Sequence, residues 1–193
     1  IINKLILSIL FLTIFLSVFF IPIYYSTSQD SFFNQNFSFE NSDYIWPIPG
    51  YTTLSSSFGK RIAPTTGAST FHKGIDIPAP EGTKLIATTN GQITFIGFLG
   101  GGGYTITLTT SNNIKISYCH VSPLYLVNVG DIITKGQLIG NVGPKYVYDV
   151  IGNNYKDPIT GNPTNGATTG CHLHIGFRVD NEYINPLYYL QSQ

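Results

Sequence analysis

The stretch Gly170–Phe177, GCHLHIGF, places two of the chain's four histidines one residue apart in an apolar, strand-like run. On an extended strand, residues i and i+2 face the same side, so His172 and His174 share a face with their Cβ atoms about 6.5 Å apart. Leu173 and Ile175 face the other side. A strand with one apolar face packed on the core and one polar face directed toward a cleft is suited to a functional site. Three interpretations remain open at this point: a metal-binding pair, a ligand beside a catalytic group, or a coincidence.

A second block, Phe71–Pro78 (FHKGIDIP), holds His72 and Asp76. Glycine, two isoleucines and a proline favour extended chain over helix. A straight strand would hold the two side chains about 13 Å apart, too far for one metal ion at about 2 Å per bond. A shared ion therefore requires a bend, which Gly74 permits. If no ion is shared, His72 is a surface histidine and Asp76 an aspartate in a turn. Two imidazoles and one carboxylate suit zinc and leave its fourth position free.

The third block, Ile114–Ser122, places His120 at a strand end before the Pro123 loop. Taken alone, this is an ordinary histidine. With it, however, all four histidines lie at a strand or a strand end, and four independent coincidences explain that poorly. Tyr118 is a possible additional hydrogen-bond donor, although core packing is the simpler interpretation.

Composition limits the class of protein. The 193 residues include 10 Lys plus Arg and 10 Asp plus Glu, and no basic cluster exceeds Lys60-Arg61. Binding of nucleic acid requires a basic surface, so nucleic acid is excluded as a partner. Twenty glycines, 13 tyrosines and 13 phenylalanines indicate an all-β, turn-rich domain. We expect strands over residues 84–89, 92–97, 104–109 and 114–120, and two short strands around a tight turn over 130–140.

The amino terminus predicts a membrane segment. Residues 5–25 carry no charge, and about 20 apolar residues in a helix span a ~30 Å hydrocarbon core. We interpret residues 1–25 as a hydrophobic helix that is an uncleaved signal anchor or a cleaved signal peptide, with a buried core helix as the alternative. Lys4 favours export of the remainder. Residues 26–45 are expected to be a flexible tether, and residues 46–193, which open with the proline-rich WPIPG, a folded domain.

The blocks FHKGIDI, YCHVS and GCHLHIGF, in this order, resemble the signatures of the lysostaphin-type (LytM-like) zinc endopeptidases of bacterial cell walls. WPIPG, SSSFGKRIAP, GTKLIATTNGQI and VGDIITKGQLIGNVG extend the resemblance over residues 46–190. The resemblance implies a two-sheet antiparallel β-sandwich, the duplicated hybrid motif, with a zinc ion in a groove. It also implies hydrolysis of peptide bonds in peptidoglycan stem peptides or cross-bridges, outside the cytoplasm and facing the cell wall.

The same resemblance assigns roles to the residues. It makes His72, Asp76 and His174 the ligands of one zinc ion. It makes His120 and His172 catalytic imidazoles that do not bind the metal, and does not say which is base and which stabiliser.

Two features depart from the family pattern. Cys119 and Cys171 each precede a proposed catalytic histidine and are expected to point away from the metal, as a disulfide or as two free thiols. The long polar stretch 144–169 is expected to form one wall of the groove, with Tyr146, Tyr148 or Tyr155 available to the substrate; a surface loop is the alternative.

Two functions of other classes are the alternatives. A non-catalytic scaffold or activator of the same fold is expected to have lost metal ligands, and none is missing here. A biotinyl or lipoyl carrier would need a modifiable lysine at a hairpin tip, for which Lys135 is the candidate, but that function leaves the histidines without a role.

Overall fold

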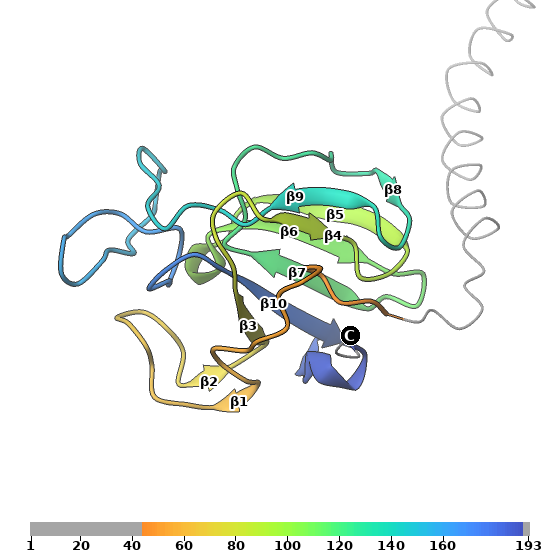
Figure 1. The fold of residues 1–193 in the computed structure, drawn as a ribbon, viewed down its shortest axis with the longest axis horizontal. Helices are drawn as coiled ribbons and strands as arrows, with labels where there is room; N and C mark the ends of the chain where they lie inside the picture. Colours follow the sequence, from red (N-terminus) through yellow and green to blue (C-terminus); the bar gives the residue numbers. More distant parts are fainter. Residues whose placement is uncertain (1–43, 191–193) are drawn as a thin grey trace, which may run out of the picture. The chain divides into compact units, whose positions relative to one another are not determined.

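A computed structural model describes residues 44–190, which form a mostly antiparallel β fold (Figure 1). The elements are β1 (Gly59–Lys60), β2 (Phe71–His72), β3 (Ile75–Pro78), β4 (Lys84–Ile86), β5 (Gly91–Phe98), the 3₁₀ turn η1 (Gly100–Gly102), β6 (Tyr104–Thr109), β7 (Lys115–Cys119), β8 (Ile132–Ile133), β9 (Leu138–Asn141), β10 (His172–Val179), β11 (Glu182–Ile184) and the 3₁₀ turn η2 (Pro186–Tyr188).

Seven strands make the main sheet, in the order β11-β10-β7-β6-β5-β8, and β3 pairs with β10. β1–β2 and β4–β9 are separate two-stranded sheets. The expected antiparallel β class is confirmed, and the second layer consists of the small β4–β9 sheet. Strand β9 packs on the main sheet: a Cβ added at Gly140 of β9 would lie 3.1 Å from Cδ1 of Ile106 in β6.

The segment 130–140 contains the two expected strands, but they do not pair with each other. β8 pairs with β5 and β9 pairs with β4. The turn between them is closed by a hydrogen bond from the Gln137 amide to the Thr134 carbonyl at 3.0 Å. It therefore sends the chain from one sheet to the other.

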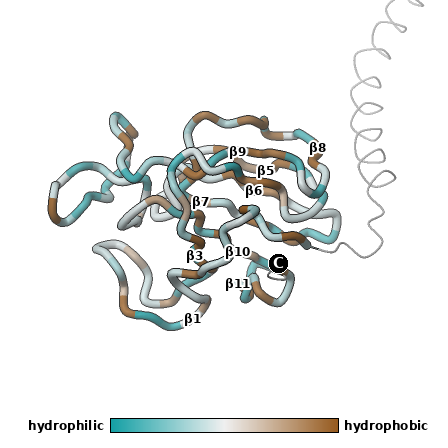
Figure 2. Tube along the Cα trace, in the orientation of Figure 1, coloured by the Kyte–Doolittle hydropathy of each residue, from teal (hydrophilic) through white to brown (hydrophobic). Residues whose placement is uncertain are grey.

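One face of the main sheet builds the core. Ile75, Ile175, Tyr118 and Ile106 are successive cross-strand partners in β3, β10, β7 and β6, and all four have no exposed surface. Hydrophobic residues follow the strands in Figure 2. Burial of each such side chain stabilises the fold by roughly 1.5–3 kcal/mol, so this row fixes how the strands are aligned.

The adjacent row of partners faces the other way. Asp76, His174, Cys119 and Thr105 occupy the neighbouring register positions of the same four strands. Because side chains alternate along a strand, the alignment that buries the core row puts Asp76 beside His174.

The expected bend between His72 and Asp76 is present, since β2 ends at His72 and β3 begins at Ile75. Gly74 sits in this bend, and its φ is not in the left-handed region. A Cβ there would clash with the carbonyl oxygen of Ile175 and lie 2.7 Å from Cε1 of His174. The glycine allows the bend to lie directly against β10.

The predicted hydrophobic helix at residues 1–25, and almost all of the tether at 26–45, lie outside the described residues. Within residues 44–190, none of the helices has the length and hydropathy needed to cross a bilayer.

We expect Gly74→Ala to lower the free energy of unfolding by about 1–3 kcal/mol, because the added methyl group overpacks the contact with β10. Chemical denaturation of the variant measures this. Gly170→Ala is the matched control, since a Cβ there meets no atom within 4 Å and its φ is not positive. Equal stability of the two variants would contradict this explanation of Gly74.

Candidate metal centre

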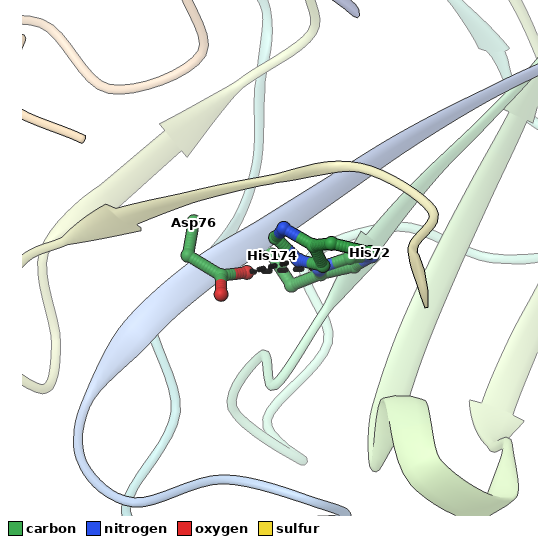
Figure 3. A group of neighbouring side chains, drawn as sticks. All are labelled: His72, Asp76 and His174. Atoms are coloured by element: carbon green, nitrogen blue, oxygen red, sulfur yellow. Dashed lines mark hydrogen bonds and ion pairs between the residues drawn. The ribbon is translucent and has the colours of Figure 1, made fainter. Parts of the chain in front are cut away.

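Three side chains from β2, β3 and β10 converge on one point (Figure 3). His72 Nε2 lies 3.0 Å from Asp76 Oδ1 and 2.9 Å from His174 Nδ1, and His174 Nδ1 lies 2.8 Å from Asp76 Oδ1. Residues 72 and 174 are 102 positions apart in the chain. The structure thus brings together the three predicted ligand residues.

The loop before β1 sets the orientation of His72. Its Nδ1–H donates to the carbonyl oxygen of Ser57 at 2.9 Å, and the Ser56 hydroxyl lies 3.1 Å from the same nitrogen. Donation from Nδ1 leaves the lone pair on Nε2, which faces the other two ligands. This loop is attached to β3 by the isolated bridge between Ser56 and Asp76.

Asp76 is held as a carboxylate. Arg61 donates from Nη1 to Asp76 Oδ2 at 3.2 Å and to the Ser56 hydroxyl at 2.8 Å. Burial raises the pKa of Asp76, but the neighbouring imidazoles of His172, His174 and His72 together outweigh it and hold the pKa well below its usual range. Oδ2 is therefore engaged by Arg61, and the charged Oδ1 faces the two imidazoles.

The three groups fit a divalent metal ion. Burial lowers the pKa of His174, which favours the neutral imidazole that a metal requires. Two imidazole nitrogens 2.9 Å apart repel each other unless a proton or a cation lies between them. A tetrahedral site with bonds of about 2.0–2.1 Å separates its ligand atoms by about 3.4 Å, close to the spacing seen here. The chain therefore has a metal-binding His-Asp-His group.

The other two histidines lie beside this group. The ring centroids of His120 and His172 are 4.6 Å apart, and His172 Nε2 lies 3.6 Å from Asp76 Oδ1. His172 donates from Nδ1 to the Gly170 carbonyl at 2.9 Å, and His120 donates from Nδ1 to the Asn165 carbonyl at 2.6 Å. Each ring is thus held with a lone pair on Nε2.

His120 reaches the site from an unusual backbone conformation. β7 ends at Cys119, and His120 has φ 58°, a left-handed value that costs a non-glycine residue about 1–2 kcal/mol. The surrounding chain fixes it there: its amide donates to Gly102, and its carbonyl accepts from Gly143. Burial and the nearby His172 and His174 lower the pKa of His120 to about 3, so its imidazole is neutral.

The predicted orientation of Cys119 is wrong. It pairs with His174 and Thr105 across the sheet, so it lies on the site face and lines the groove. The expectation treated His120 as a continuation of the strand, whereas the strand ends one residue earlier. Cys171 packs against the core and also reaches the groove. Both cysteines are free, and burial raises the pKa of Cys119 to about 11, so its thiol is protonated.

The metal-binding group opens into a groove of about 850 Å³. Its lining includes Ile62 and Gly67 from the connection between β1 and β2, Gly101 of η1, and Ala167. From the stretch 144–169, only Ala167 and Thr169 line the groove, so the expectation that Tyr146, Tyr148 or Tyr155 do so is wrong. Tyr146 instead donates to Asp157 at 2.8 Å, and Tyr148 is 60% exposed.

The sequence predicted the position of one further side chain near the site and missed two. Tyr118 is a core residue, as the simpler interpretation held: its hydroxyl accepts from the Thr88 amide at 2.8 Å. Sequence reasoning missed Arg61 and Asn165. Arg61 lies within the quoted SSSFGKRIAP, but nothing in the spacing connects it to Asp76. Asn165 was one polar residue in a long polar loop.

The comparisons with known proteins agree with this geometry. The model of peptidase family M23 matches residues 70–186. The DD-carboxypeptidase/endopeptidase Mpg of Neisseria meningitidis is 32% identical over 137 residues, which cover 71% of this chain and 27% of that protein. A zinc-containing peptidase from Vibrio cholerae superposes with a TM-score of 0.58 at 25% identity, over 76% of this chain and 39% of that one.

The catalytic domain of lysostaphin from Staphylococcus simulans gives a TM-score of 0.56 at 26% identity, over 72% of this chain and 91% of that domain. The chain belongs to peptidase family M23, as its sequence motifs predicted. It spans only about a quarter of the length of the curated relative Mpg.

We expect Asn165→Ala to release His120. The Asn165 side chain is fully buried, accepts from the Tyr104 amide at 2.8 Å and donates to the Val121 carbonyl at 3.1 Å, so it fixes the carbonyl that holds His120. Losing both bonds costs about 2–4 kcal/mol of stability. Nitrogen-15 NMR of the His120 ring is expected to change from a fixed Nδ1–H form to a mixture.

Asn153→Ala is the control for this variant. Asn153 donates to the Thr164 carbonyl at 2.8 Å in the same loop, and its hydrogen bonds do not involve His120. It is expected to lose some stability without changing the His120 ring signals. Identical His120 spectra in the two variants would show that Asn165 does not set this tautomer.

Proposed function

We propose that this chain is a zinc-dependent endopeptidase that hydrolyses peptide bonds in peptidoglycan stem peptides or cross-bridges. The observation that carries the proposal is the convergence of His72, Asp76 and His174 in an open groove, beside two further histidines. Membership of family M23, and the resemblance to a relative named as a DD-carboxypeptidase/endopeptidase, support it.

In this proposal His72 Nε2, Asp76 Oδ1 and His174 Nδ1 hold one zinc ion. When bound, zinc acts as a Lewis acid toward the scissile carbonyl and lowers the pKa of water toward about 7. The protein's own contribution to the ligands is their preorganisation: Ser57 fixes the His72 ring, and Arg61 fixes the carboxylate of Asp76.

We assign proton transfer and oxyanion stabilisation to His120 and His172. Because each donates from Nδ1 to a backbone carbonyl, each offers Nε2 to the groove as a proton acceptor. Once protonated, the same nitrogen can donate to the leaving amine or to a developing oxyanion. His172 Nε2 lies 3.6 Å from Asp76 Oδ1, which favours His172 for contact with the reacting atoms.

The alternative is a non-catalytic scaffold or activator of the same fold. Such a protein has no need of a complete ligand set or of fixed imidazole tautomers. This chain has both, so the enzymatic function is the better supported of the two.

The arrangement of the whole chain is also a proposal. We propose that residues 1–25 are a signal anchor or signal peptide, residues 26–45 a tether, and residues 46–193 the zinc endopeptidase domain. The uncharged apolar run at residues 5–25 supports export. The enzyme would then act outside the cytoplasm on the cell wall, anchored to the membrane or secreted.

Two substitutions separate metal binding from proton transfer. We expect His174→Ala to lose zinc and activity together, because it removes one of three ligands. We expect His120→Ala to keep most of its zinc while activity falls by about 10²–10⁴-fold, the usual contribution of acid–base catalysis. Metal analysis and digestion of purified peptidoglycan measure the two properties.

Tyr148→Ala, at an exposed position, is the control and should match the unmodified protein in both assays. Full zinc content in His174→Ala would contradict the ligand assignment. A zinc-loaded wild-type protein that digests no peptidoglycan would favour the non-catalytic alternative.

A further inference from the structure

Three basic side chains gather on the face of the sheet that carries the metal centre. Arg178 belongs to β10, Lys115 is its cross-strand partner on β7, and Lys73 lies in the bend between β2 and β3. Because side chains alternate along a strand, Arg178 shares a face of β10 with His174, four residues before it. The three cations come from distant parts of the chain, so the sequence shows no basic cluster there.

Tyr183 brings two of these cations together. It is the cross-strand partner of Arg178 on β11, so the two side chains lie on the same face. The Lys73 Nζ lies 4.9 Å from the centroid of the Tyr183 ring, and the Arg178 Cζ lies 5.8 Å from it. An aromatic ring attracts cations, but it carries no formal charge that would neutralise them.

No carboxylate balances this positive charge. None of the ion pairs within residues 44–190 involves any of the three basic side chains. In that range Asp76 is the one acidic residue that lines the groove, and Arg61 and the histidines already engage it. Glu182 precedes Tyr183 on β11 and therefore faces the other side of the strand.

The groove connects the basic side chains with the metal centre. Its lining includes Lys73 and Tyr183 together with His174 and Gly176 of β10. A Cβ added at Gly176 would lie 3.6 Å from Nε2 of His174 and 3.0 Å from the carbonyl oxygen of Lys73. Because residue 176 is a glycine, no side chain of β10 stands between His174 and Arg178 on this face.

We propose that Lys73, Arg178 and Tyr183 form a subsite that binds a carboxylate of the peptide substrate. Carboxylates are the natural acceptors for lysine and arginine donors, and the tyrosine ring offers an apolar surface to the rest of the bound residue. Arg178 lies about 13 Å along the strand from His174, a distance that an extended peptide covers in about four residues. The subsite therefore recognises an acidic group within about four residues of the scissile bond.

This inference rests on the proposed peptidase function and specifies its substrates as acidic peptides. The test uses a synthetic cross-linked stem peptide and analogues in which one carboxylate at a time is replaced by a carboxamide. We expect one replacement to lower kcat/KM of the wild type by about tenfold, because a hydrogen bond to a charged group is lost. Calorimetry with the His120→Ala protein should show the same analogue binding about tenfold more weakly.

Substitutions identify the residues that read this charge. Lys73→Gln and Arg178→Gln keep a polar side chain without the positive charge, so each should reduce the preference for that carboxylate to about threefold or less. Lys84→Gln is the matched control: it removes an exposed lysine of β4 that does not line the groove, and it should keep the full preference. Zinc content is measured in each variant, because Lys73 follows a metal ligand.

A wild-type protein that treats every carboxamide analogue like the parent peptide would overturn the inference. An unchanged preference in both Lys73→Gln and Arg178→Gln would also overturn it. If neither variant folds, the salt dependence of the wild-type preference decides, because added salt screens a partly exposed charge pair, and a preference that salt does not reduce counts against the subsite. If no peptide is cleaved but the carboxylate form still binds more tightly, the proposed function fails and the subsite stands.

Discussion

The alignment of β3 with β10 is the constraint on which the metal centre depends. It places Asp76 directly opposite His174, and the same alignment pairs Ile75 with Ile175 and Ile77 with Leu173 on the core face. A slip by one residue would turn the buried side chains toward the groove. Turning Ile75 and Ile77 of β3 out of the core would cost roughly 3–6 kcal/mol, a large part of the ~5–15 kcal/mol that stabilises a domain. The packing of the hydrophobic core therefore also fixes Asp76 opposite His174.

The second histidine pair depends on backbone carbonyls. Asn165 and Gly170 accept the Nδ1 protons of His120 and His172, and so decide which nitrogen faces the groove. For His120 this requires a left-handed backbone at the end of β7, which the loop carrying Asn165 stabilises. The long stretch 144–169 thus holds the His120 ring, in addition to bordering the groove at Ala167 and Thr169.

The sequence predicted those parts of the site that follow from local periodicity. The shared face of His172 and His174 needed only the alternation of a strand, and the bend before Asp76 needed only the reach of a metal ligand. The orientation of Cys119 was predicted wrongly, because β7 ends at Cys119 and His120 does not continue its alternation. Contacts between distant parts of the chain hid Arg61 and Asn165: their partners lie 15 and 45 residues away, and no short-range pattern records such contacts.

The most direct test of the central claim is zinc K-edge X-ray absorption of the purified protein. The account predicts one zinc ion with nitrogen and oxygen neighbours at about 2.0–2.2 Å, including two imidazoles, and no sulfur. A sulfur neighbour at about 2.3 Å would place Cys119 on the metal, and a third imidazole would place His120 or His172 there. Either result would contradict the division of the four histidines into two that bind the metal and two that act beside it.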